Sequence, residues 1–357
     1  MMTDFDEVAV FDIGGTNFRS GLWSPHAGLR EVRRRDAINY LNTPHINPAE
    51  LQFALADYLL AETVRLTGLT ATPNLNASIS MGAPVNARSE ILMQSGPLWG
   101  PHAQDFDLLT TLRERLPQVS WTICNDVTAS LLRYVGDPEM ALSGRVLLIT
   151  VSTGIAARLY DCARQAVPLD PVHGLQGEIG HLRVEAQLRG KSIPMICDCG
   201  GEGHLNAYSS GRGMASLLAC LDRLPLDLSA SRLAAALADP PAARRPQFVT
   251  AVREGDPAAL ELLDFITRPL ANILSTLLTC DPLMETIVLT GGVVDALGNA
   301  YVDSLNRQFC AVGLFQISER DPDYLKRRLR LAPPDDDGGL VGAGRLAHMR
   351  VAPYAYR

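Results

Sequence analysis

The segment VAVFDIGGTNFRSGLW, residues 8–23, constrains the fold of this chain more than any other stretch. A short apolar strand is followed at once by an aspartate, two glycines and a threonine, and then by an arginine. Backbone N–H groups in a glycine-rich bend form a concave anion site, and an aspartate at the end of a strand can hold the water shell of a metal ion. A plain β-hairpin turn would explain the glycines but gives no role to the two charged residues. We therefore predict a phosphate site built from Asp12, Gly14, Gly15, Thr16 and Arg19.

A second strand-turn-strand unit, GRVLLITVSTGIAARLYD, follows at residues 144–161. Its bend again combines a hydroxyl with a glycine, here Thr153 and Gly154. Two such units in one chain indicate an internal duplication.

Strands and helices alternate along the chain. Further apolar strands are expected within residues 76–85, 119–126 and 284–294. A helix is expected over residues 47–68, which begin with Asn-Pro, and the Ala- and Leu-rich residues 211–280 are expected to be helical as well. A loop at residues 333–339 and a closing helix end the chain. This alternation indicates the α/β class, and 357 residues favour two domains.

Charge and hydropathy argue against a nucleic-acid or membrane partner. The formal net charge is −7, and the two basic clusters, EVRRRDA and AARRPQ, are short and bordered by acids or a proline, so both are expected to be solvated faces. No stretch approaches the roughly 20 apolar residues that span a bilayer. The first residues, MMTDFDE, are acidic where a signal peptide is basic, so we expect a cytoplasmic protein.

The cysteines divide into isolated residues and one cluster. Seven cysteines, an odd number, argue against a disulfide framework in a chain without a secretion signal. Cys162, Cys220, Cys280 and Cys310 stand alone in apolar surroundings and are expected to be small buried hydrophobes. In contrast, His181, Cys197, Cys199 and His204 fall within a short span and predict a closed, tetrahedral structural zinc site. A chance cluster with a surface His204 is the alternative.

Asp126, in the segment NDVTAS, stands where a strand gives way to a helix. An aspartate at this place can cap the helix. It can also act as a general base that accepts the proton of an attacking hydroxyl, which is the proton chemistry that phosphoryl transfer requires.

In this order and spacing, the motifs resemble those of the ROK family (repressor, open reading frame, kinase), within the actin and hexokinase-like ATPase superfamily. DIGGTNFR resembles the first phosphate loop, NDVTAS the catalytic segment and VSTGIAAR the second phosphate loop. GEIGH with CDCGGEGHLN resembles the two-part family signature, and IVLTGGVV the nucleotide-side turn. The resemblance implies a two-domain actin-like ATPase (ribonuclease H-like) fold with an active-site cleft between the domains. We place the smaller domain at residues 1–123 plus 341–357, and the larger domain at 124–340.

The resemblance also implies roles for single residues. Asp126 is expected to be the general base, with Asn125, Glu178, His181 and Asn206 on the polyol substrate. Asp12 faces Mg²⁺, and Arg19 belongs to the same site. The ATP phosphates are expected at Gly14, Gly15, Thr16, Thr153 and Gly154, with Gly291 and Gly292 admitting the nucleoside. The zinc ion fixes its loop and does no Lewis-acid chemistry.

Three departures from the family pattern affect these expectations. His204 replaces the usual third cysteine, which predicts a Cys₂His₂ zinc set. Asn206 replaces the usual glutamate, and because an amide can donate as well as accept hydrogen bonds, the substrate is expected to differ there from glucose. Ala156, Ala157 and Arg158 replace the usual glycines, which predicts a stiffer or shifted second loop, with Arg158 either reaching a phosphate or lying outward in solvent.

The resulting hypothesis is an ATP-dependent kinase for a sugar or sugar-like polyol, with a C7-cyclitol as a candidate substrate. A glucokinase or N-acetylhexosamine kinase is the alternative, and a non-catalytic sugar sensor or a ROK regulator is a further one. A regulator with an N-terminal helix-turn-helix is not expected, because the first phosphate strand starts within about ten residues of Met1. The family further implies a homo-oligomer, either a dimer or a tetramer.

Overall fold

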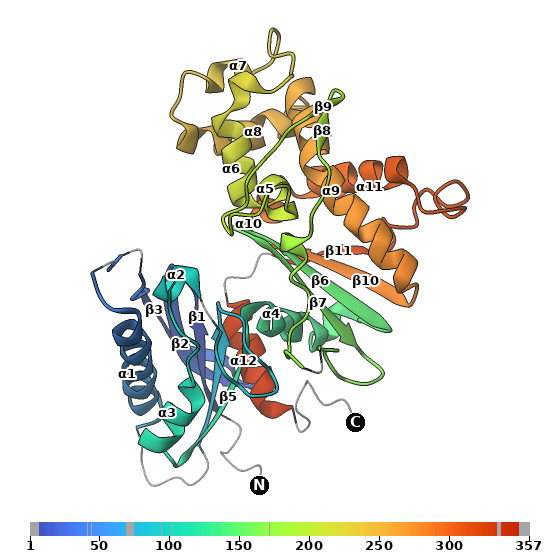
Figure 1. Cartoon of the computed structure of the whole chain (residues 1–357). Helices are drawn as coiled ribbons and strands as arrows, with labels where there is room; N and C mark the ends of the chain where they lie inside the picture. Colours follow the sequence, from blue (N-terminus) through green and yellow to red (C-terminus); the bar gives the residue numbers. More distant parts are fainter. Residues whose placement is uncertain are drawn as a thin grey trace. The chain divides into compact units, whose positions relative to one another are not determined.

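The computed structural model describes residues 7–40, 42–43, 45–68, 75–93, 95–100, 102–170, 172–333 and 337–349 (Figure 1). The chain folds into two compact units. Unit 1 comprises Met1–Leu142, Arg164–Gln176 and Asp335–Arg357, and unit 2 comprises Ser143–Ala163 and Gly177–Pro334. Residues 350–357, which we assigned to the smaller domain, lie outside the described residues.

Unit 1 is built on a five-stranded sheet with the order β3-β2-β1-β4-β5. The strands are β1 (Val8–Ile13), β2 (Asn17–Ser24), β3 (Gly28–Asp36), β4 (Leu75–Met81) and β5 (Val119–Asn125). β1 and β2 form an antiparallel hairpin, whereas β1, β4 and β5 run parallel. β1, β4 and β5 therefore end at the same edge of the sheet.

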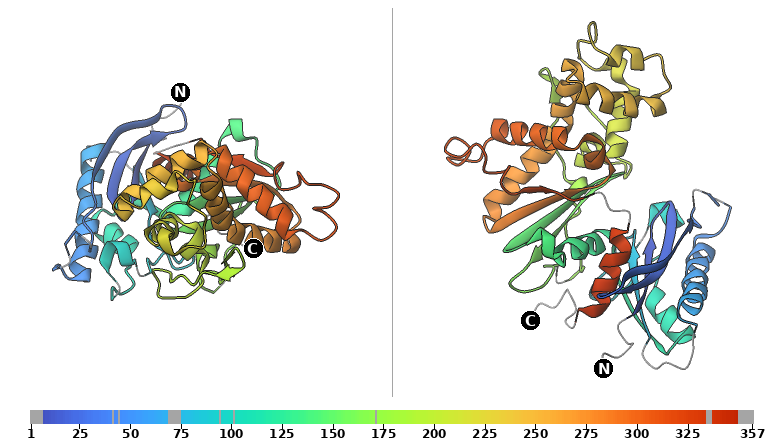
Figure 2. Two further views of the ribbon diagram at one scale, coloured as in Figure 1. Left: turned by 90° about the horizontal axis from the view of Figure 1, so that it is seen from above. Right: turned by 180° about the vertical axis from the view of Figure 1, so that it is seen from behind.

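Helices cover both faces of this sheet (Figure 2). The alternation of side chains along β1 explains this arrangement. Phe11 and Ile13 pack in the core with α1 (Pro48–Thr67) and α3 (Leu108–Arg115). Val8 and Val10 point the other way and pack against Leu340 of α12 (Gly338–His348). Successive strand residues face opposite sides, so a strand buried on both faces is a continuous apolar run.

Helix α4 (Asp126–Val135) packs along α12, and this packing makes it part of unit 1. The boundary between the units thus falls after α4, whereas the motif order places it before this helix. The contact with α12, near the end of the chain, joins distant segments and has no local sequence signal.

Unit 2 contains a four-stranded sheet with the order β11-β10-β6-β7. Its strands are β6 (Arg145–Val151), β7 (Ile155–Asp161), β10 (Met284–Thr290) and β11 (Leu329–Leu331). β6 and β7 form an antiparallel hairpin, and β6 lies parallel to β10. The order β7-β6-β10 thus repeats the order β2-β1-β4 of unit 1, which supports the predicted duplication.

The helices of unit 2 lie partly within residues 211–280, where the sequence predicts them, and partly outside that range, at residues 205–209, 292–297 and 299–312. They include α5 (Leu205–Ser209), α6 (Gly211–Ala219), α7 (Leu233–Ala236), α8 (Arg244–Arg253), α9 (Pro257–Cys280), α10 (Gly292–Leu297) and α11 (Asn299–Val312). α9 lies against α11, and both contribute to the core that covers Leu147, Ile149 and Ile287 of the sheet.

The predicted start of α1 is confirmed. The Asn47 side chain accepts a hydrogen bond from the Ala49 N–H at 2.9 Å, and Pro48 is the first helical residue. The helix ends at Gly68, whose φ of 66° is in the left-handed region that glycine adopts most readily. The closing helix is confirmed as α12, while residues 334–336 of the predicted loop lie outside the described residues.

Asp256 caps α9 and yields a testable prediction. Its buried carboxylate accepts hydrogen bonds from the Ala259 N–H (3.0 Å), the Arg232 N–H (2.8 Å) and the Ser231 hydroxyl (2.8 Å). Asp256→Ala leaves the buried Ala259 N–H and the partly buried Arg232 N–H without this acceptor. We expect a loss of about 2 kcal/mol, which lowers the midpoint of thermal unfolding by roughly 4 to 8 °C.

The same carboxylate gives this loss a pH dependence. Burial opposes ionisation of Asp256, but the hydrogen bonds outweigh it and lower the pKa of the carboxyl. A lowered folded-state pKa stabilises the fold above the unfolded-state pKa, and this stability is lost as the pH falls through the folded-state value. The difference in the midpoint of thermal unfolding between wild type and Asp256→Ala should therefore become smaller as the pH falls. Asp107→Ala at the exposed cap of α3 is the control, and an equal loss in both variants would contradict the role of burial.

Several local expectations are wrong. None of the four isolated cysteines is fully buried: Cys162, Cys220 and Cys310 are partly exposed, and Cys280 is exposed. Cys220 and Cys280 lie at helix ends, which explains their exposure. None of the seven cysteines, all within the described residues, forms a disulfide bond. The cluster EVRRRDA is an exposed face of β3, but Arg244 of AARRPQ is buried and donates to the Leu218 carbonyl at 2.8 Å.

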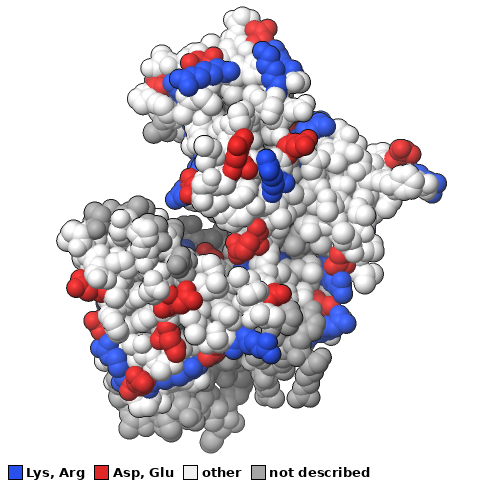
Figure 3. Space-filling model, viewed as in Figure 1, with Lys and Arg blue, Asp and Glu red and all other residues white. Residues whose placement is uncertain are grey.

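Lys and Arg side chains are interspersed with Asp and Glu on the face in Figure 3. Within the described ranges, no helix combines the length and hydropathy that crossing a bilayer requires.

Candidate active site

Three segments of unit 1 meet at the carboxyl edge of its parallel strands. Ile13 is in register with Met81, and Met81 with Asn125. The residues that follow these strand ends are Gly14, Gly82 and Asp126, and they are therefore neighbours. A Cβ atom at Gly82 would lie 3.4 Å from the Gly14 Cα and 3.7 Å from Asp126 Oδ2. Ligands of open α/β sheets bind at this edge.

The first glycine bend is a tight turn with an open side. The Gly14 N–H donates to the Asn17 carbonyl at 3.1 Å and so closes the turn. Gly14 does not have a positive φ, and a Cβ atom there would meet only the Asn17 oxygen, at 3.5 Å. Thr16 at the tip is exposed. The backbone conformation at position 14 therefore does not require a glycine. The presence of a glycine there is explained if a ligand approaches the backbone closely.

Asp12 is held from two sides. The Arg19 guanidinium lies 2.8 Å from its carboxylate, and the Ser80 hydroxyl donates to it at 2.9 Å. Burial nevertheless raises the pKa of Asp12 above its usual value, and the charge of Arg19 only partly offsets this. A further cation beside Asp12 would favour the ionised carboxylate.

Asn125, and not Asp126, caps α4. The Asn125 side chain accepts from the Val127 N–H at 3.0 Å, and its amide nitrogen donates to the Ala83 carbonyl at 3.0 Å. Asp126 is the first residue of the helix and is exposed, with one carboxylate oxygen 2.8 Å from the same N–H. Because Asn125 is already the N-cap residue of α4, helix capping does not account for the aspartate at position 126.

Unit 2 presents a second bend at the end of β6. The Ser152 N–H donates to the Gly154 carbonyl at 2.9 Å, and Thr153 is exposed. Gly291 follows the parallel strand β10 and has a φ of 103°. A Cβ atom there would lie 2.7 Å from the Val151 carbonyl oxygen. Both the backbone angle and the close contact require a glycine at this position.

The residues expected to stiffen the second bend belong to β7. Ala156, Ala157 and Arg158 pair with Thr150, Ile149 and Leu148 of β6. Arg158 is only 4% exposed, so the expectation of an outward, solvated arginine is wrong. Its strand position accounts for its burial.

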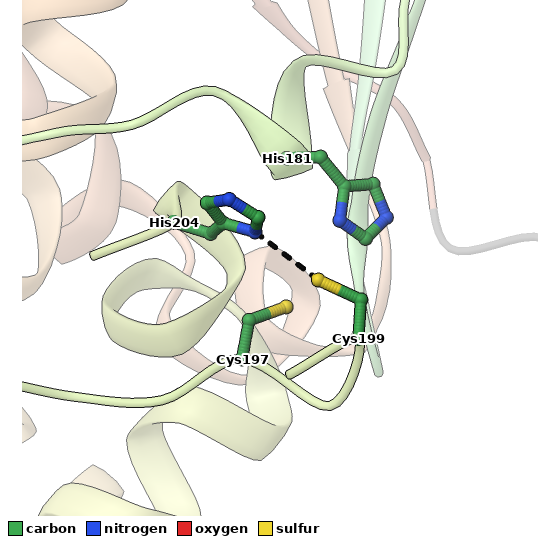
Figure 4. Close-up of side chains that lie close together, drawn as sticks. All are labelled: His181, Cys197, Cys199 and His204. Carbon is green, nitrogen blue, oxygen red and sulfur yellow. Dashed lines mark hydrogen bonds between the residues drawn. The ribbon is translucent and has the colours of Figure 1, made fainter. Parts of the chain in front are cut away.

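Four side chains that could hold a metal ion come together in unit 2, as Figure 4 shows. The ligand atoms of His181, Cys197, Cys199 and His204 all lie within 4.8 Å of one another. The Cys199 sulfur is 3.2 Å from His204 Nδ1, and the two imidazoles are perpendicular with centroids 5.7 Å apart. A tetrahedral zinc site with these ligands would separate their atoms by about 3.3 to 3.8 Å, so small side-chain shifts suffice.

The backbone holds this arrangement. The Leu205 N–H donates to the Leu182 carbonyl at 2.9 Å, which ties the residue after His204 to the residue after His181. Gly200 has a φ of 85°, and a Cβ atom at Gly201 would collide with the His204 ring. Both glycines of the CDCGG segment are thus required by the geometry.

Of the remaining predicted residues, Glu178 and Asn206 are close to this cluster in sequence, and Gly292 lies at the start of another helix. Glu178 is exposed and immediately precedes the short 3₁₀ turn Ile179–His181. The Asn206 side-chain oxygen accepts from the Ile155 N–H at 2.7 Å, a contact to the second bend that the sequence does not reveal. Gly292 begins α10, and its carbonyl accepts from Arg245 at 3.0 Å.

Three residues that lie against the predicted site residues were not among the predicted ones. Ser80 and Gly82 are two of them, and the third is Gly180, where a Cβ atom would lie 2.5 Å from Asn206 Oδ1. The glycine directly after the apolar strand in SISMGAPV was the available signal for Gly82.

Comparison with known proteins identifies the family. The family model described as ROK family matches residues 9–350. The chain belongs to the ROK family. One relative, the 2-epi-5-epi-valiolone 7-kinase of an Actinoplanes species, is 37% identical over 97% of this chain and 94% of its own. The C(7)-cyclitol 7-kinase of Streptomyces hygroscopicus subsp. jinggangensis is 33% identical over 98% and 96%. The N-acetyl-D-glucosamine kinase of Pectobacterium atrosepticum is 30% identical over 79% and 83%.

Solved ROK structures share the fold. The ROK hexokinase from Thermus thermophilus has a TM-score of 0.66 and 22% identity, covering 96% of this chain and 98% of its own. A ROK glucokinase from Streptomyces griseus, solved with glucose and AMPPNP, has a TM-score of 0.64 and 18% identity, covering 96% and 99%. The α/β, actin-like ATPase fold class expected from the ROK motifs is confirmed.

Proposed function

We propose that this chain is an ATP-dependent kinase that phosphorylates the hydroxyl group on carbon 7 of a C7-cyclitol. The observation that carries the substrate class is the 37% identity over 97% of the chain to a relative named as a valiolone 7-kinase. The exposed carboxylate of Asp126 beside the first glycine bend supports the reaction type.

In the proposed reaction, Asp126 accepts the proton of the acceptor hydroxyl. The hydroxyl oxygen forms a bond to the γ-phosphorus of ATP, and the bond from that phosphorus to the β–γ bridging oxygen breaks. ADP and the phosphorylated polyol are the products. Catalysis of this kind is mainly positioning and charge stabilisation, so one well-placed base and donors on the phosphates are sufficient.

The two glycine bends are proposed to face the ATP phosphates. Gly14, Gly15 and Thr16 belong to the first bend, and Thr153 and Gly154 to the second; Gly291 and Gly292 admit the nucleoside. Mg²⁺, when bound, neutralises charge on the phosphate oxygens. Asp12 fits this ion because its carboxylate is mostly buried and the positive charge of Arg19 only partly offsets the cost of ionising it there.

Zinc is proposed to be structural, held by His181, Cys197, Cys199 and His204. Burial raises the pKa of the Cys197 thiol, so zinc binding is expected to release a proton from it. A closed four-ligand set leaves no open position for a substrate. The site would fix Glu178 and His181, which we propose contact the polyol together with Asn125. We further propose that the protein acts in the cytoplasm as a dimer or tetramer.

Substrate preference is the test of the proposed class. ADP release should be measured with 2-epi-5-epi-valiolone, other C7-cyclitols, glucose and N-acetyl-D-glucosamine. We expect kcat/KM to be roughly 5- to 150-fold higher for a cyclitol, since one mismatched buried polar group costs about 1 to 3 kcal/mol. The second candidate is an N-acetyl-D-glucosamine kinase, which the 30% identical relative suggests. A higher kcat/KM for that sugar would contradict the cyclitol proposal.

A further inference from the structure

We infer that Asn206 is a positioning residue for the second glycine bend and thereby sets the affinity for nucleotide rather than for the polyol. This inference rests on the proposed function, because it assumes that the bend at Thr153 and Gly154 faces the ATP phosphates. The family resemblance suggested the opposite role for Asn206, a contact to the substrate.

The Asn206 side chain is oriented by its surroundings. Its oxygen accepts the Ile155 N–H at 2.7 Å, directly after the bend. A Cβ atom at Gly180 would lie 2.5 Å from the amide oxygen and 2.6 Å from the amide nitrogen, so the amide lies flat over that glycine. A Cβ atom at Gly154 would lie 3.7 and 3.9 Å from the same two atoms. The amide thus touches the bend and the Glu178–His181 segment at once.

The segment that carries Asn206 holds the bend at two further points. The Gly211 N–H donates to the Ser152 carbonyl at 2.7 Å, and the Arg212 N–H donates to the Thr153 carbonyl at 3.4 Å. Both donors lie at the start of α6, immediately after α5. Ser152, Thr153 and Ile155 are therefore all bonded through their backbone to this segment, and for Ile155 the partner is the Asn206 side chain.

The direction of this bond explains the need for an acceptor at position 206. A backbone N–H requires an oxygen, and an amide supplies it without a charge. An aspartate, which is shorter than the glutamate usual in the family, would also accept the bond, but it would hold a negative charge directly beside a bend that we propose to hold phosphates. Electrostatic repulsion would then weaken nucleotide binding.

The test compares two ligands in three variants by calorimetry. Kd is measured for ADP with Mg²⁺ and, separately, for the cyclitol that the wild type phosphorylates best. Asn206→Ala removes the acceptor. Asn206→Asp keeps an acceptor oxygen for the Ile155 N–H, so the fold should be retained, but it adds a negative charge. Asn299→Ala, at an exposed asparagine of α11 in the same unit, is the control.

We expect both Asn206 variants to raise the Kd of ADP about tenfold, the range of one hydrogen bond, with less than a threefold change for the cyclitol. The control should match the wild type for both ligands. An unchanged ADP affinity in either folded variant, or a loss confined to the cyclitol, would overturn the inference. Failure of the wild type to transfer phosphate to any polyol would instead overturn the proposed function, so the two failures are distinguishable.

Discussion

Asp126→Asn will lower kcat for phosphoryl transfer by about 10²- to 10⁴-fold, the usual contribution of a general base. An amide has the shape of the carboxylate but cannot accept the proton of the acceptor hydroxyl. The fold should survive, since the Asn125 side chain caps α4 and an amide oxygen at position 126 can still accept the Val127 N–H. The measurement is steady-state ADP release at saturating ATP and cyclitol.

Asp107→Asn provides the matched control for this substitution. Asp107 is also a carboxylate at the start of a helix in unit 1, and it accepts the Thr110 N–H at 3.1 Å. It has no place in the proposed site, so its kcat should equal that of the wild type. Equal rates in Asp126→Asn and the wild type would show that Asp126 is not the base.

Loss of zinc is the second large effect that we expect. The purified chain should contain about one zinc ion, and Cys197→Ser should reduce this to a small fraction, because a hydroxyl is a poor zinc ligand. Cys197 is buried, so the vacancy cannot be filled by solvent without local rearrangement. We expect the midpoint of thermal unfolding to fall by on the order of 10 °C.

Elemental analysis and thermal unfolding test this prediction together. Cys280→Ser is the control, because Cys280 is an exposed cysteine of the same unit that lies outside the cluster. It should retain both the zinc and the stability. A folded wild type without zinc, or the same stability in Cys197→Ser and wild type, would remove the structural zinc site from this account.

The sequence predicts local features of this fold well. Helix α1 begins where Asn47 and Pro48 supply a cap and a first-turn proline, because both act within a few residues. The two hairpins were evident from apolar runs interrupted by a hydroxyl and glycines. The four cluster residues come together as their spacing indicated, since short loops limit how far they can separate.

Contacts between distant segments were not predictable in the same way. Arg244 appeared to be a solvated residue, but it is buried against carbonyl groups more than twenty positions away in the chain. The bond from Ile155 to Asn206 joins residues separated by 51 positions. Gly82 matters because β1, β4 and β5 end in register, which depends on strand pairing rather than on neighbouring residues.

The most direct test of the account is a crystal structure of the chain with a C7-cyclitol, Mg²⁺ and a non-hydrolysable ATP analogue. We predict a carboxylate oxygen of Asp126 about 2.6 to 3.2 Å from the hydroxyl on carbon 7, with that hydroxyl in line with the γ-phosphorus. A complex in which the Asp126 carboxylate makes no contact with the acceptor hydroxyl would contradict the account.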